Sequence, residues 1–143
     1  MNGTGTAVEG ETIRVRSAGC ASDCGPDDVY RIGAYETTYS VPRFNNAGSH
    51  VTALVLQNPT SRSISGEVLF RVASGTQVAN APFILGPRQT LVLNTATVPG
   101  ANGVSGGITV IHDGGYGDLA GKAVALEPAT GFSFDSALVP RPH

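Results

Sequence analysis

The sequence predicts an all-β fold: a two-sheet antiparallel β-sandwich, Ig-like, with no significant helix. The chain has 143 residues, among them 19 glycines and 9 prolines, and both residue types disfavour helices. Val, Thr and Ser are abundant, and β-branched side chains fit a pleated sheet. Short alternating or apolar runs recur between turn signals, which is typical of sandwiches and barrels.

The chain divides into an N-terminal extension, residues 1–34, and a sandwich, residues 35–143, which we expect to form one continuous domain. Alternatively, the extension is the tail of a preceding domain. Within it, residues 12–17 alternate between apolar and basic side chains and predict a strand. We expect this strand to pair with an open sheet edge of a neighbouring subunit, or else to pack within its own chain. The candidate assembly residues are Thr12, Ile13, Arg14, Val15 and Arg16.

Cys20 and Cys24 are separated by three residues and followed by a Gly-Pro turn, so a local disulfide is the favoured interpretation. Free thiols or half of a metal site are the alternatives, although a zinc site needs about four ligands and there is no second cysteine pair. A disulfide implies an oxidising compartment, and we therefore expect a secreted or cell-surface protein. The same loop carries Asp23, Asp27 and Asp28, which could hold calcium, contact a partner or simply be solvated.

The strands of the sandwich follow in order. Residues 29–34 and 35–44 favour extended chain, with Pro42 marking an edge or a strand switch. Residues 51–57 are nearly all apolar and predict a central strand, and residues 64–72 alternate, with Phe70 inward and Glu67 outward. Further strands are expected at residues 77–80, 83–85, 88–94 with Leu91, Val92 and Leu93 buried, 105–112, 119–126, and in a last short strand containing Phe132 and Phe134.

Four stretches carry a resemblance to a known family: residues 39–46, 56–60, 105–110 and 125–135. They resemble the Ig-like β-sandwich modules near the C-termini of large secreted or surface proteins of environmental Gram-negative bacteria. The resemblance covers about residues 35–139 and rests on turn and strand signatures. It implies an extracellular location and an accessory or structural role. It carries over no functional residues.

The charge pattern argues against nucleic acid as a partner, and the lengths of the apolar segments argue against a membrane. Lys, Arg, Asp and Glu make up 14% of the chain, against about 25% in ordinary domains. Eight arginines and one lysine are scattered, whereas nucleic-acid binding needs a clustered basic face. No segment approaches the roughly 20 apolar residues of a membrane span, so we expect no membrane insertion.

Two ligand sites are candidates. Asp113 and Asp118 lie in a Gly-rich loop and could present oxygens to calcium; otherwise we expect no cofactor. The alternative is a tight turn whose Asp side chains cap backbone amides. Tyr35, Tyr39 and Tyr116 could form a sugar-binding platform, although Trp is absent, and the alternative is cross-strand packing or an Ig-type tyrosine corner.

No catalytic set is evident. The three histidines are His50, His112 and His143, and no Gly-x-Ser-x-Gly elbow is present. We therefore expect a non-enzymatic structural module that assembles with copies of itself or with its parent protein, as in a surface-fibre subunit joined by terminal-strand exchange. The alternative is a glycan-binding accessory module, with or without calcium.

Overall fold

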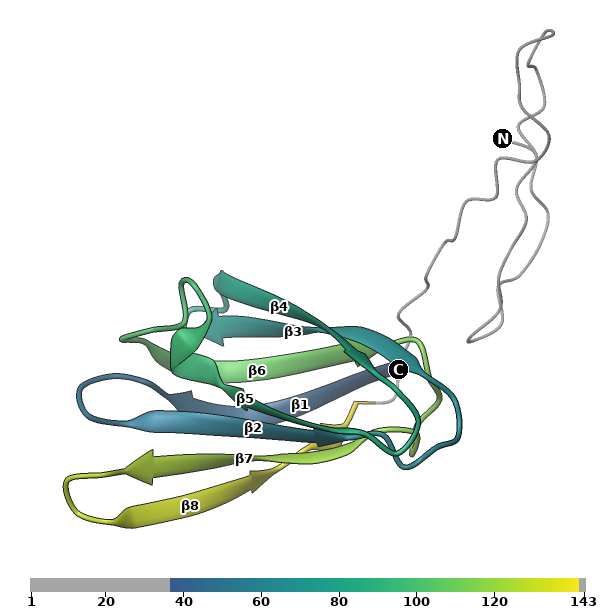
Figure 1. Cartoon of the computed structure of the whole chain (residues 1–143). Coiled ribbons are helices and arrows are strands. Elements are labelled where there is room, and N and C mark those ends of the chain that lie inside the picture. The colour runs from purple at the N-terminus through teal and green to yellow at the C-terminus, as the bar shows by residue number, and fades with distance from the viewer. Residues whose placement is uncertain (1–36, 142–143) are drawn as a thin grey trace, which may run out of the picture.

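The computed structural model describes residues 37–141, and there the predicted two-sheet antiparallel β-sandwich is confirmed (Figure 1). One short 3-10 turn, η1, is the single helical piece of this part of the chain. The elements are β1 (Thr37–Asn45), β2 (Val51–Gln57), β3 (Ile64–Val72), β4 (Gln77–Leu85), β5 (Thr90–Asn94), η1 (Thr95–Thr97), β6 (Ser105–His112), β7 (Ala120–Glu127), β8 (Phe132–Ala137) and β9 (Val139–Pro140).

Two layers make up the sandwich. One sheet has the strand order β4-β3-β6-β1-β9 and the other has β5-β2-β7-β8, and every neighbouring pair is antiparallel. Only β3 to β4 and β7 to β8 connect neighbours within a sheet, while the other connections cross between sheets. The sheets are thereby joined by loops at the ends of their strands, and β8 forms one outer edge, at the bottom of Figure 1.

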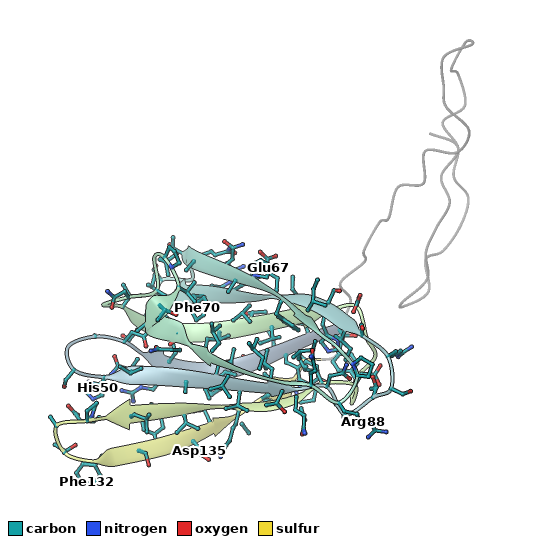
Figure 2. The ribbon with its side chains drawn as sticks, in the orientation of Figure 1. His50, Glu67, Phe70, Arg88, Phe132 and Asp135 are labelled. Atoms are coloured by element: carbon teal, nitrogen blue, oxygen red, sulfur yellow. The ribbon has the colours of Figure 1, made fainter. Side chains whose placement is uncertain are left out.

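The core follows the period of two in the sequence. In β2 and β3 every second side chain is buried, because alternate residues of a strand point to opposite faces. Within this core Phe44 of β1 and Phe70 of β3 pack edge to face, with ring centroids 5.3 Å apart; Figure 2 labels Phe70. Full burial of such a side chain stabilises the fold by roughly 1.5–3 kcal/mol.

A close backbone approach explains one glycine of β6. A Cβ atom on Gly106 would lie 1.9 Å from the carbonyl oxygen of Arg71 in β3, whereas the nearest such atom to a Cβ on Gly107 is 3.6 Å away. Gly106 thus lets β3 and β6 pair closely.

Asn58 joins two loops at one end of the sandwich. Its side chain is fully buried, and Nδ2 donates to the carbonyl oxygens of Arg62 at 2.7 Å, Leu85 at 3.1 Å and Gly86 at 3.0 Å. Oδ1 accepts from the amide and the hydroxyl of Thr60. One amide therefore holds the β2–β3 loop against the end of β4.

Three sequence predictions needed correction or refinement. Val92 was expected to be buried but is 66% exposed, because it pairs with Val55 on the outer face while its neighbours lie opposite the buried Leu54 and Leu56. The two runs 77–80 and 83–85 form one strand, β4, which tolerates Pro82 because it is an edge strand. Pro42 does lie at an irregularity, since the register between β1 and β6 shifts between Val41 and Phe44.

Candidate functional site

Aromatic side chains gather where β1 begins and β6 ends. The ring of Tyr39 stacks on that of His112, with centroids 5.5 Å apart, and lies 5.7 Å from that of Tyr116. The Tyr39 hydroxyl accepts from the Gly117 amide at 2.8 Å. His112 is buried, and its Nδ1 accepts from the Gly114 amide. This cluster fixes the loop between β6 and β7 against the start of β1.

The burial of Tyr39 bears on the predicted sugar platform. Tyr39 is only 3% exposed, so it offers no open ring face to a sugar, and Tyr116 is 40% exposed. The Tyr116 hydroxyl donates to the carbonyl oxygen of Arg141 at 2.7 Å. Tyr35, the third predicted residue, lies outside the described residues. The cross-strand packing named as the alternative accounts for Tyr39.

The two predicted calcium ligands point to different backbone amides. Asp113 accepts from the Ser65 amide at 2.8 Å, and Asp118 accepts from the Gly115 amide at 2.9 Å and from the Arg62 guanidinium. Asp113 thus holds the loop between β6 and β7 to β3, and Asp118 stabilises the turn within that loop. Among residues 37–141 no group of three or more His, Cys, Asp or Glu side chains could hold a metal ion, so calcium binding here stays a prediction.

Asp118 is the residue of this loop whose pKa is shifted. Burial by itself would raise its pKa, but hydrogen bonds from Arg62 and the Gly115 amide, together with the guanidinium charge, outweigh burial and hold the pKa of Asp118 below its usual value. The ionised form of Asp118 is therefore the form that the fold stabilises.

A second polar cluster lies at the opposite end. Glu127 of β7 accepts from the Ser49 hydroxyl at 2.7 Å and contacts Nε2 of His50 at 2.8 Å; Nδ1 of His50 lies 3.2 Å from the carbonyl oxygen of Ala47. Serine and histidine thus meet the same carboxylate rather than each other. A serine nucleophile activated by a base needs a serine–histidine contact, which this cluster lacks. Its contacts instead tie the turn between β1 and β2 to the end of β7.

Two exposed phenylalanines lie on β8. Its residues Phe132 and Phe134 pair with Glu127 and Ala125. Because Ala125 is buried and paired residues share a face, both phenylalanines face the inside of the sandwich. They are nevertheless 77% and 44% exposed, so the opposite sheet does not cover β8 fully. Figure 2 shows Phe132 at the turn end of β8, on the periphery of the molecule.

One side chain from the opposite sheet reaches this surface. The Arg43 guanidinium lies 5.4 Å from the centre of the Phe134 ring, within the range of a cation–π contact. Arg43 follows Pro42 at the shift in register of β1, and such bulges commonly redirect side chains. We call Arg43, Phe132 and Phe134 the β8 patch.

The β8 edge also lacks two of the features that usually block strand addition, although it carries one charged residue, Asp135. Edge strands are commonly protected by proline, lysine or a bulge. The edge strands of the first sheet are β4, which contains Pro82, and β9, which contains Pro140, whereas β8 has no proline and no lysine. At the other edge of its sheet, β5 packs Leu91 and Leu93 against the core.

Sequence reasoning found the β8 phenylalanines but gave them no function. Their exposure depends on how far the opposite sheet covers β8, and no local sequence pattern predicts this coverage. The predicted disulfide at Cys20 and Cys24, and the predicted assembly residues 12–16, lie outside the described residues. Within residues 37–141 no helix is long and apolar enough to cross a membrane.

The fold defines the class of protein: an antiparallel two-sheet β-sandwich. No protein-family model matches the chain, and no curated protein matches it. The chain is similar to a solved structure from Thermotoga maritima, the crystal structure of Thermotoga maritima 1070, with a TM-score of 0.60 and 9% identity over 75% of this chain and 94% of that one. At this identity the likeness shows the fold alone.

Proposed function

We propose that the chain is a non-enzymatic structural module of a secreted or cell-surface protein, and that it associates with copies of itself through the edge of the sandwich formed by β8. One observation carries the proposal. Phe132 and Phe134 lie only partly covered on the inner face of an edge strand that has no protecting proline or lysine. An apolar patch joined to an open backbone edge favours pairing with another chain.

The energetics support association. Covering a phenylalanine side chain stabilises a contact by roughly 1.5–3 kcal/mol when it becomes fully buried. Both phenylalanines of the β8 patch would lose exposed surface when another strand pairs with β8. Backbone hydrogen bonds along the six residues of β8 would add affinity and direction.

The proposed compartment rests on Cys20 and Cys24 together with the resemblance to surface modules. An oxidising environment is where a local disulfide forms and persists. Intact mass measured with and without reductant and alkylation tests this part of the proposal. Alkylation of both thiols without reductant, in protein isolated from its native compartment, would argue against secretion.

Analytical ultracentrifugation over a wide concentration range tests self-association. We expect the full chain to form oligomers as concentration rises, and the double variant Phe132→Ser, Phe134→Ser to need at least about tenfold higher concentration. Val92→Ser is the matched control, because Val92 is also an exposed apolar residue but lies on β5 at the other edge of the same sheet. A wild-type chain that stays monomeric at high concentration would exclude the proposed function.

A further inference from the structure

The open edge of β8 has a defined length and two chemically different faces. Among the described residues no strand pairs with β8 on the side away from β7. An added strand would lie beside the six residues Phe132–Ala137. Its inner side chains would meet Phe132 and Phe134. Its outer side chains would meet the face of Ser133 and Asp135, since Asp135 pairs with Val124, on the opposite face from Ala125.

These faces specify the strand that would fit. It needs apolar side chains two residues apart on one face, to cover Phe132 and Phe134. On the other face, basic side chains suit Asp135, whose carboxylate already binds Lys122 at 2.6 Å but is half exposed. Cross-strand pairs of opposite charge, and pairs of large apolar groups, both stabilise a sheet.

Residues 12–17 have this pattern. The segment Thr-Ile-Arg-Val-Arg-Ser is six residues long, as β8 is, with Ile13 and Val15 two apart and Arg14 and Arg16 between and after them. Because the side-chain period of a strand is two, placing Ile13 and Val15 on the inner face places both arginines on the outer face. The match therefore includes length, spacing and charge.

We propose that residues 12–17 of one copy add as a strand to β8 of a neighbouring copy. This inference rests on the proposed function and names the partner for the same edge. The 19 residues 18–36 join the segment to β1 and can span about 60 Å when extended. This length is sufficient for residues 12–17 to reach β8 of a second molecule. β8 of that copy then occupies an interior position in the sheet.

Photo-crosslinking identifies the occupant directly. The photoreactive amino acid benzoylphenylalanine replaces Phe134 in the full chain, which keeps an aromatic group at the site and leaves both cysteines in place. Isotopically light and heavy chains are mixed, irradiated and analysed by mass spectrometry. We expect crosslinks to residues 12–17 in mixed light–heavy pairs, and none to that segment when the probe replaces Val92 instead.

Other crosslinks would overturn the inference. Crosslinks between two β8 strands would show that copies associate edge to edge, which leaves the proposed function standing and removes this inference. Crosslinks to residues 12–17 confined to light–light and heavy–heavy products would show packing within one chain. A chain that remains monomeric would remove both proposals.

A second variant pair makes the test independent of the probe. Ile13→Asp with Val15→Asp places two charges against the phenylalanines and should raise the concentration needed for assembly at least about tenfold. Thr4→Asp with Thr6→Asp introduces the same two charges at the same spacing outside the segment and should assemble like the wild type. Equal assembly of the two variants would contradict strand addition by residues 12–17.

Discussion

Replacement of the buried Asn58 by aspartate tests how the sandwich holds its loops. The substitution keeps the shape of the side chain and keeps Oδ1, which accepts from Thr60. It removes the amide group that donates to Arg62, Leu85 and Gly86. In its place a carboxylate oxygen would face three carbonyl oxygens.

The size of the effect follows from these contacts. A buried polar group that loses its partner costs about 1–3 kcal/mol, and more when a charge is involved. The contact to Leu85 is buried and the other two are partly buried. The full penalty for the buried contact and smaller penalties for the other two lower the free energy of unfolding by about 3–5 kcal/mol at neutral pH. That is a large share of the roughly 5–15 kcal/mol that stabilises a typical domain.

Urea denaturation at several pH values measures the loss. Protonation of the introduced carboxyl group would restore one donor, so the folded state raises the pKa of this group. A group with a raised folded pKa favours the fold at low pH and loses that contribution as pH rises. We therefore expect the deficit of Asn58→Asp relative to wild type to be smaller at about pH 4 than at about pH 7.

Asn94→Asp is the matched control. Asn94 precedes η1, and its Oδ1 accepts from the Ala96 amide at 3.0 Å. Aspartate can accept the same bond, so this variant should stay within about 0.5 kcal/mol of the wild type. If Asn58→Asp and Asn94→Asp unfolded at the same urea concentration, the structural role given to Asn58 would be refuted.

Two further predictions concern backbone spacing and acid stability. Gly106→Ala should lower the thermal midpoint strongly, because its Cβ would overlap the Arg71 carbonyl, while Gly107→Ala should have a small effect; calorimetry that ranked them in reverse order would contradict the close approach of β3 and β6. Asp118 has a lowered folded pKa, so its contribution to stability is present above the unfolded value of 3.8 and is lost as pH falls through the folded value. Asp118→Asn should therefore lose less stability than the wild type on acidification below about pH 4, and parallel curves of unfolding free energy against pH would speak against this reasoning.

Sequence reasoning reached the fold because the local pattern and the tertiary environment agree along most strands. β2 was recognised as central from its apolar run, and the inward side chains of β3 were recognised from their alternation. Val92 was missed because the apolar triplet at residues 91–93 contains no polar residue to mark its outward face. The register with β2, which a single strand does not encode, decides it.

The candidate surface was harder to predict for the same reason. Phe132 and Phe134 have the period expected of inward residues, and they do face inward. Their exposure arises because the first sheet covers the β8 end of the second only in part. Tyr39 shows the opposite case, since the loop between β6 and β7 returns to bury it. Both outcomes depend on contacts between residues far apart in the chain.

The hydrogen bond from the Arg141 amide to the Thr38 carbonyl, at 2.8 Å, has a mechanical consequence. It places the first residues of β1 beside the last residues of β9, with the two strands antiparallel. Tension applied between these ends would load the β1–β9 ladder as a zipper, one bond at a time, rather than in shear. β9, paired at only Tyr39 and Ser40, would peel away first, and it would yield at low force while the remaining strands kept their pairing.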